Sequence, residues 1–492
     1  MNLDPGASVT LQITAACFHD GAAPSLLSFA GARQEIHAHF ASQAAQYASI
    51  ETHNTQFNAL LARATADLRM LTTTLPTGPY PYAGVPWFNT PFGRDGIITA
   101  LECLWLNPAL ARGVLAYLAQ TQATETIPEQ DAEPGKILHE TRKGEMATLG
   151  EMPFARYYGS ADATPLFVVL AGAYHERTAD RAFIEQIWLN IQAALDWIKD
   201  YGDSDDDGFI EYQTRCAHGL VHQGWKDSDD AVFHAEGTLA QGPIALCEVQ
   251  GYAYAAWQAG AKLATALGHV DLAADFSARA KRLRARFETA FWCDELSMCA
   301  LALDGNKHQC RVRASNAGHC LFSGIAGFDH AACVARALIR PEFFSGWGIR
   351  TLAAGEPRYN PMGYRTGSVW PHDNALIAAG MARYSRSEES LQVFSGMFDA
   401  AIHFDLHRLP ELFCGFGREN GEGPVLYPVA CAPQAWSAAA VFLILQAPLG
   451  LAIEAPERKI TGASVSSALP AAGRYFESRD RRRKCRPADC AP

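Results

Sequence analysis

The sequence lacks the features that mark secreted, membrane-spanning and disulfide-stabilised proteins. Its start, MNLDPGASVTLQIT, has no basic segment followed by an apolar run, so no signal peptide is visible. No apolar stretch is long enough to span a membrane; even SAAAVFLILQAPLG is too short and is closed by Pro448. The thirteen cysteines are irregularly spaced, which is typical of reduced thiols. We therefore expect a cytoplasmic protein.

Excess basic charge is also absent. The net charge of -11 argues against nucleic acid or an anionic membrane as a partner. His139 and Glu140 do not begin the zinc motif HExxH, because position 143 is lysine. We therefore expect neither a metal nor another cofactor. The sequence does not indicate an oligomeric state.

What the sequence does contain is helical periodicity, from about residue 34 onward. Apolar residues recur at three- and four-residue spacing, with alanine-rich faces that suit close packing. Short connections such as LGHVD (267–271) alternate with long ones rich in Trp, Asp, Glu, Arg and His. Periodicity alone predicts a large all-α domain; the motifs described below favour an (α/α)6 barrel. The helical segments lie near residues 51–71, 94–105, 107–122, 163–175, 181–200, 242–268, 270–290, 314–323, 328–339, 367–383, 385–402 and 433–446.

One long connection combines carboxylates with a tryptophan, in the stretch VHQGWKDSDDAV at residues 221–232. An exposed acidic loop needs no tryptophan, and a core segment would not tolerate the carboxylates. A sugar pocket uses both, because aromatic rings stack on sugars and carboxyl groups catalyse glycoside hydrolysis. Trp225, Lys226 and Asp227 are therefore candidate site residues.

A second candidate carboxyl is Glu411, in RLPELFCGFGR at residues 408–418. Glycoside hydrolysis needs one carboxyl to protonate the leaving oxygen and another to activate water or attack the anomeric carbon. Spacing alone supports this pairing weakly, because 52 acidic residues offer many pairs.

Two further residues, Arg94 and Asp95, stand at the predicted start of a helix in GVPWFNTPFGRDGIITALECLW (84–105). A guanidinium beside a carboxylate can bind adjacent sugar hydroxyls, and Trp87 and Phe92 lie nearby in the sequence. The alternative is that Asp95 only caps the helix.

Other loops repeat the combination of aromatic and polar residues. Tyr158 precedes a helix, Trp347 lies in SGWGIRTL, and Trp370 and His372 lie in GYRTGSVWPHDNALIA. Each one alone could serve packing or capping; their repetition in successive loops favours a substrate-facing role.

The stretch DSDDDGFIEYQT (203–214) resembles the front of a calcium loop. The twelfth position, where a bidentate glutamate is expected, is Thr214. We interpret the stretch as an Asp/Gly turn that leads to Glu211 and Tyr212, and whether it binds calcium stays open.

Seven motifs in order give the chain a family resemblance: PWFNTPFGRDGIITALE, YYGSADATPLF, DDDGFIEY, GWKDS, YNPMGYRTGSVWPHDNALIAAG, RLPELFCG and PQAWSAAA. Together they resemble the bacterial amylo-α-1,6-glucosidase family, which is akin to the glucosidase domain of glycogen debranching enzyme. The resemblance covers roughly residues 35–455. It implies an (α/α)6 barrel that hydrolyses α-glucosides with inversion.

The resemblance also implies roles for single residues. Asp227 matches the general acid, in the loop before the sixth helix, and Glu411 the general base, in the loop before the last. Arg94 and Asp95 match the pair that holds the terminal glucose. The pocket-lining positions match Trp225, Trp370, His372 and Trp436.

Both ends depart from the family pattern. Residues 8–16, SVTLQITAA, alternate like a strand, and we interpret residues 1–33 as a remnant of a β-rich N-terminal domain. Residues 34–455 form the predicted barrel domain. Residues 456–492 lack periodicity and are predicted to be a disordered tail.

The resulting prediction is an inverting α-glucosidase that removes terminal α-linked glucose, such as α-1,6 branch stubs, from an α-glucan or α-glucoside. Burial near Trp225 should keep Asp227 protonated, and the Lys226 ammonium should point away from that carboxyl. A transferase or phosphorylase on the same barrel, and an inactive glycan-binding remnant, are the alternatives.

Overall fold

The computed structural model describes residues 2–16, 26–44, 47–151 and 153–462. The chain divides into two compact units, residues 1–49 and residues 50–492. The second unit contains all the predicted site residues.

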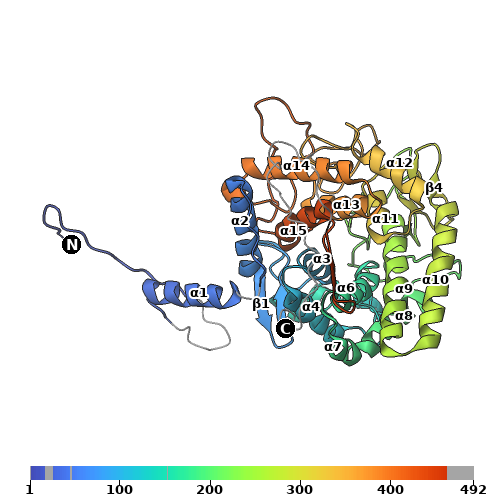
Figure 1. The fold of residues 1–492 in the computed structure, drawn as a ribbon, viewed down its shortest axis with the longest axis horizontal. Helices are drawn as coiled ribbons and strands as arrows, with labels where there is room; N and C mark the ends of the chain where they lie inside the picture. Colours follow the sequence, from blue (N-terminus) through green and yellow to red (C-terminus); the bar gives the residue numbers. More distant parts are fainter. Residues whose placement is uncertain (1, 17–25, 45–46, 152, 463–492) are drawn as a thin grey trace. The chain divides into compact units, whose positions relative to one another are not determined.

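Six helices of the second unit form a closed inner ring, in which each helix packs on the next and the last packs on the first (Figure 1). This arrangement confirms the predicted (α/α)6 barrel. In order around the ring they are α3 (Gly93–Glu102), α6 (Ala163–Thr178), α9 (Cys247–Leu267), α11 (Asn316–Ser323), α13 (Pro371–Arg383) and α15 (Ala435–Leu449).

Six further helices cover the ring from outside, and each precedes an inner helix in the sequence. Thus α4 packs on α3 and α6, α8 packs on α6 and α9, and α14 packs on α13 and α15. The outer helices are α2 (Thr55–Leu71), α4 (Pro108–Thr121), α8 (Trp188–Asp200) with the short α7 (Arg181–Gln186) before it, α10 (Val270–Ala290), α12 (Phe328–Leu338) and α14 (Ser387–His403).

The burial of each helix follows from its apolar pattern. In the outer helix α10 the buried residues are Phe276, Ala280, Leu283 and Phe287, a single stripe at helical spacing. The inner helix α15 buries every residue from Ala435 to Leu445, because it is apolar all round and packs on both sides. Glycine permits the closest contact between inner helices: a Cβ at Gly380 of α13 would lie 2.5 Å from the backbone nitrogen of Phe322 in α11.

The connections set the position of the functional loops. Connections from an inner helix to the next outer one are short, for example between Leu267 and Val270, so neighbouring helices are antiparallel. Connections from an outer helix to the next inner one are long, as at residues 201–246 and 404–434. Because the inner helices therefore run in one direction, the long loops meet at one end of the ring. Isolated β-bridges join them there, such as Gly84 with Gln434 and Val369 with Phe413.

Short elements decorate these loops. The hairpin of β1 (Thr72–Leu75) and β2 (Gly78–Pro81) packs on α4. One three-stranded sheet has the order β3 (Ala245–Leu246), β6 (Ala302–Leu303) and β7 (Gln309–Cys310), all antiparallel. The remaining elements are β4 (Trp292–Cys293) with β5 (Met298–Cys299), helix α5 (Glu145–Thr148), and the 3-10 turns η1 (Pro128–Gln130), η2 (Pro153–Ala155) and η3 (Asp405–His407).

The ends differ from the sequence predictions. In the first unit, residues 8–16 form no strand, so the predicted strand is wrong; Leu11 and Ile13 are exposed, and an isolated strand has no partner to complete its hydrogen bonds. Helix α1 (Phe29–Ala44) begins before residue 34. At the other end, β8 (Ala452–Glu454) and β9 (Lys459–Thr461) form a hairpin across the predicted start of the tail, and residues 463–492 lie outside the described residues.

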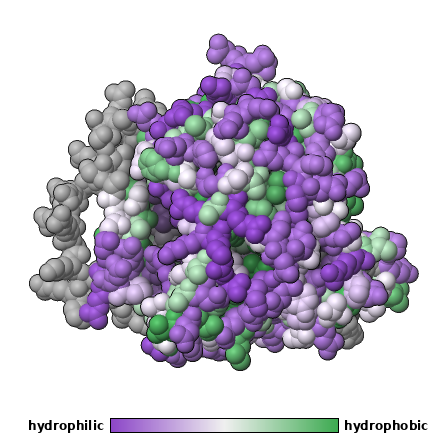
Figure 2. All heavy atoms as spheres, turned by 90° about the vertical axis from the view of Figure 1, so that its right-hand side faces the viewer, coloured by the Kyte–Doolittle hydropathy of each residue, from purple (hydrophilic) through white to green (hydrophobic). Residues whose placement is uncertain are grey.

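The face of the molecule shown in Figure 2 is mostly hydrophilic, with hydrophobic side chains in small separate groups. That pattern fits outer helices that turn their polar faces to solvent. Among the described residues, no helix has the length and apolar character needed to cross a bilayer.

Candidate active site

Asp227 lies in the loop before α9 and is held between two arginines from other loops. Arg94, in the first turn of α3, donates through Nη2 to Oδ2 of Asp227 at 2.9 Å. Arg365, in the loop before α13, donates through Nη2 to Oδ1 at 2.8 Å. Both oxygens of the carboxylate are therefore occupied by charged donors.

The two arginines are anchored differently. Arg94 also binds both oxygens of the buried Asp162, at 3.2 and 3.3 Å, and the Gly224 carbonyl at 3.0 Å. Arg365 lies over the ring of Trp370, with its guanidinium carbon 4.1 Å from the ring centroid, and near Trp225 at 5.2 Å. Arg94 is thus tied to the scaffold by hydrogen bonds, and Arg365 by cation–π contacts.

This environment corrects the predicted protonation of Asp227. Burial would raise the pKa of Asp227, but Arg365 and Arg94 outweigh burial and lower that pKa to about 2. The carboxyl is therefore ionised in the unliganded protein. The prediction that burial beside Trp225 keeps Asp227 protonated is wrong, because it did not include the two guanidinium groups.

Lys226, by contrast, is oriented as predicted. Its ammonium donates to the Thr351 carbonyl at 2.6 Å and is directed into the protein, away from the Asp227 carboxyl. Burial lowers the pKa of Lys226 to about 8. This orientation does not support the predicted contact of Lys226 with substrate, which stays a prediction.

Glu411 lies in the loop before α15, as predicted, and is almost completely buried. Its Oε1 accepts a hydrogen bond from the Tyr364 hydroxyl at 2.5 Å, and its Oε2 accepts one from the Cys431 backbone N–H at 3.0 Å. Burial raises the pKa of Glu411, and these two hydrogen bonds partly offset that rise. The site thus holds two carboxyl groups in different environments.

Asp95 is a third carboxyl at this site. Burial, opposed by Arg94 and reinforced by Asp227 and Glu411, raises the pKa of Asp95 to about 7. Gln434 donates to its Oδ1 at 3.3 Å. The first turn of α3 thus places both Arg94 and Asp95 at the site, and their contact with sugar hydroxyls stays a prediction.

The three tryptophans predicted to line the pocket pack on one another and form an aromatic layer. Trp225, Trp370 and Trp436 each expose at most 2% of their surface. His372 stacks on Trp436 with ring centroids 3.7 Å apart, and burial lowers the pKa of His372 well below its usual value. Trp225 and Trp370 contact the Arg365 guanidinium; direct stacking of these rings on a sugar stays a prediction.

The other predicted residues lie at more varied places. Trp87 is exposed by 55% and donates from its indole nitrogen to the Val429 carbonyl at 2.9 Å, and Phe92 precedes α3 directly. Tyr158 is buried and donates to the Thr121 carbonyl at 2.7 Å. Trp347 is buried beneath Arg418. The described contacts therefore give Tyr158 and Trp347 a packing role.

The sequence reading missed Tyr364, Arg365 and Gln434, although each lies in or beside a quoted motif. Tyr364 and Arg365 stand inside GYRTGSVW, and Gln434 stands inside PQAWSAAA, two residues before the predicted Trp436. The sequence signal for these residues was only that each is a polar residue inside a loop motif. Such a signal does not show which side chain of another loop the residue will contact.

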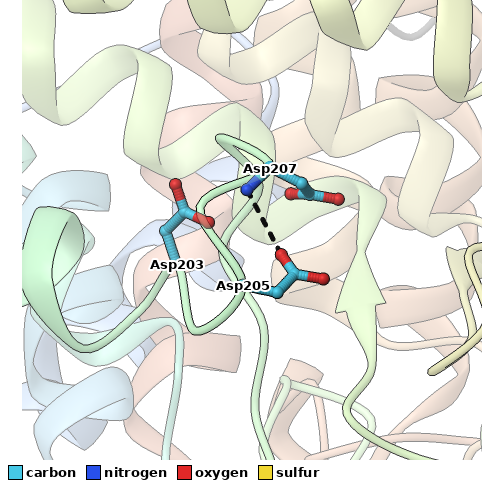
Figure 3. Close-up of side chains that lie close together, drawn as sticks. All are labelled: Asp203, Asp205 and Asp207. Atoms are coloured by element: carbon cyan, nitrogen blue, oxygen red, sulfur yellow. Dashed lines mark hydrogen bonds between the residues drawn. The ribbon is translucent and has the colours of Figure 1, made fainter.

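The acidic stretch 203–214 forms a separate cluster (Figure 3). Asp203, Asp205 and Asp207 place carboxylate oxygens within 4.8 Å of one another. Lys307, from the turn between β6 and β7, contacts Asp205 at 3.0 Å and Asp207 at 2.8 Å, and also pairs with Glu211. The lysine ammonium thus provides the positive charge that a cation would provide in a calcium loop.

Replacing Lys307 by methionine should lower the Tm by about 2–4 °C, because several carboxylates would lose their counter-charge. Millimolar Ca²⁺ should restore part of the loss in the variant and leave wild type unchanged, as measured by thermal unfolding. Lys262, whose exposed pair with Glu176 spans 3.5 Å, supplies the matched control Lys262→Met. A calcium-dependent Tm in wild type would contradict this role of Lys307.

Comparison with known proteins places most of the chain in a family. The model of the mannosylglycerate hydrolase MGH1-like glycoside hydrolase domain matches residues 93–405, well over half of the chain. The chain belongs to this family. The matched range contains Asp227, Tyr364 and Arg365 and ends shortly before Glu411.

Solved structures support the fold of this MGH1-like domain. An uncharacterized conserved protein from Thermus thermophilus aligns with a TM-score of 0.59 and 13% identity, over 78% of this chain and 99% of its own. The GH63 mannosylglycerate hydrolase of the same organism, in complex with glucose, aligns with a TM-score of 0.58 and 15% identity, over 79% of this chain and 100% of its own. No curated protein matches the chain.

The predicted class, a glycoside hydrolase domain on an (α/α)6 barrel, is therefore confirmed. The matching family is the MGH1-like one rather than the amylo-α-1,6-glucosidase family that the motifs resemble.

Proposed function

We propose that this MGH1-like domain is an inverting α-glycosidase that removes a terminal α-linked glucose, with Asp227 as general acid and Glu411 as general base. One observation carries the proposal: two carboxyl groups from distant loops are both held by the consecutive residues Tyr364 and Arg365. Two carboxyls at one barrel mouth are what hydrolysis with an activated water requires.

In the proposed reaction Asp227 gives its proton to the glycosidic oxygen as the bond to the anomeric carbon breaks. A water attacks that carbon from the opposite face and passes a proton to Glu411, and exchange with solvent then removes the proton from Glu411 and returns one to Asp227. Arg94 and Asp95 are proposed to bind hydroxyls of the glucose. Because each oxygen of Asp227 accepts from an arginine at rest, protonation of Asp227 requires that one of these hydrogen bonds be given up when substrate enters.

The substrate has two candidates. The motifs favour terminal glucose on an α-glucan or α-glucoside, including α-1,6 stubs. The family description and the Thermus relative, named a mannosylglycerate hydrolase, favour an α-hexosyl glycerate. Both candidates place a neutral hexose against Arg94 and Asp95, and they differ in the leaving group.

Proton NMR during the first minutes of reaction tests the proposal. With isomaltose, panose, α-glucosylglycerate and α-mannosylglycerate as substrates, we expect the sugar released from at least one of them to appear first as the β-anomer. Release of the α-anomer would show retention and contradict the roles of Asp227 and Glu411. Sugar release that requires phosphate would indicate a phosphorylase instead.

A further inference from the structure

Tyr364 and Arg365 are adjacent in the sequence, yet each contacts a different carboxyl of the site. The Tyr364 hydroxyl binds Glu411 at 2.5 Å, and Arg365 binds Asp227 at 2.8 Å. The two carboxyls lie in separate loops, at residues 404–434 and 201–246. We propose that the dipeptide Tyr364–Arg365 is a positioning element that fixes both reacting carboxyl groups relative to each other. This inference rests on the proposed function.

The dipeptide is itself rigidly supported by Trp370. The Trp370 indole nitrogen donates to the Tyr364 carbonyl at 2.9 Å, and the two rings meet edge to face at 4.9 Å. The Arg365 guanidinium lies over the same indole and exposes little surface. Trp370 thus fixes both side chains of the dipeptide, which explains why a fully buried indole stands at the start of α13.

The backbone around the dipeptide leaves little freedom. The Ser368 hydroxyl donates to the Tyr364 carbonyl at 2.7 Å, and the Gly367 N–H donates to Thr351 Oγ1 at 2.9 Å. Gly367 has a φ of +155°, and a Cβ there would lie 2.3 Å from the Asn360 carbonyl oxygen. The loop is closed on itself just after the dipeptide, so one fixed stretch of backbone carries both side chains.

Arg365 has no competing hydrogen-bond acceptor among the described residues. Its Nε and Nη1 are buried without a partner, whereas Arg94 is shared with Asp162 and Gly224. Removing Arg94 would therefore disturb the scaffold, and removing Arg365 acts chiefly on Asp227. Glu411, in turn, keeps its hydrogen bond from the Cys431 N–H when the Tyr364 hydroxyl is removed. Arg365 and Tyr364 are thus the positions at which each carboxyl can be perturbed separately.

Double-mutant kinetics test the inference with Tyr364→Phe and Arg365→Gln. Each should lower kcat at least tenfold with a smaller change in KM, because the hydrogen bonds hold groups that act in the transition state. In the Asp227→Asn background, Arg365→Gln should lower kcat by less than about a further threefold, whereas in the Glu411→Gln background it should have its full effect. Tyr364→Phe should show the opposite pattern, with its full effect in Asp227→Asn and a small one in Glu411→Gln. Losses that multiply in every background would overturn the inference, because a general structural defect behaves that way.

Matched controls remove the same groups elsewhere. Tyr174→Phe deletes a hydroxyl that binds Asp180 at 2.8 Å, and Arg386→Gln breaks the ion pair of Arg386 with Glu389 at the start of α14. Both pairs lie outside the loops that carry the two carboxyls, and we expect kcat to stay within about twofold of wild type. Losses in these controls as large as in Tyr364→Phe or Arg365→Gln would also overturn the inference.

Thermal unfolding separates this inference from the proposed function, since it needs no substrate. The Tm changes should be non-additive for Arg365→Gln with Asp227→Asn and for Tyr364→Phe with Glu411→Gln, and additive for the crossed pairs. If the enzyme is active but the Tm changes are additive for all pairs, this inference is overturned and the proposed function is not. The Tm changes of the variants could be non-additive while the wild-type protein releases no sugar from any substrate. That result would overturn the proposed function and, with it, the catalytic role of these contacts.

Discussion

Replacing Glu411 by glutamine is expected to lower kcat by about 10²–10⁴-fold, the usual contribution of general acid–base catalysis. Glutamine has nearly the same shape but cannot accept the proton of the attacking water. KM should change much less, because Glu411 acts on the water rather than on the sugar. The measurement is steady-state release of hexose from the best substrate found by NMR.

The loss at Glu411 should be equally large for a glycosyl fluoride and for an alkyl glycoside. A fluoride leaves without help from an acid, but water must still be activated. Glu102→Gln is the matched control: Glu102 is also fully buried, lies at the far end of α3, and burial raises its pKa well above its usual value. A Glu411→Gln variant that retains wild-type kcat would remove Glu411 from the role of base.

Replacing Asp227 by asparagine is expected to cost about 10²–10⁴-fold in kcat for an alkyl glycoside. The same change should cost far less for the corresponding glycosyl fluoride, because fluoride needs no proton from the enzyme. This dependence on the leaving group distinguishes the acid from the base. Comparison of the two substrates in one variant measures it, independently of how much folded protein is present.

The control for Asp227→Asn lies in the same loop. Asp230 is exposed, and Asp230→Asn should leave kcat for both substrates within about twofold of wild type. An Asp227→Asn variant that loses the same factor with fluoride and with alkyl glycoside would assign Asp227 to holding Arg94 and Arg365. In that case the proton would have to come from another carboxyl, and Asp95, with a pKa of about 7, would be the first to examine.

The helices could be predicted from the sequence because they carry their own signal, whereas their closure into a barrel was predicted from the motifs and the family resemblance. The stripe from Phe276 to Phe287 in α10 and the all-apolar α15 show in the order of residues which face is buried. The predicted strand at residues 8–16 failed for the complementary reason. Alternation predicts a strand only when a partner exists, and a sequence pattern does not show the partner.

The site could be predicted only in part, for a related reason. The motifs identified Asp227 and Glu411 and the loops that carry them. They did not identify Arg365 beside Asp227, or Lys307 beside Asp205 and Asp207, because these pairings depend on how separate loops meet. The protonation state of Asp227 was consequently mispredicted, since a pKa depends on neighbours in space rather than in sequence.

The closed ring has a consequence for how the chain is made. Helix α15 completes the ring by packing on α3, and Gln434 directly before it binds Asp95 in α3. A nascent chain that has not yet released residues 435–449 from the ribosome therefore exposes the sides of α3 and α13 that α15 covers. Folding intermediates with exposed apolar surface aggregate readily. Helix α15 therefore covers these apolar sides only after the last part of the barrel has been synthesised.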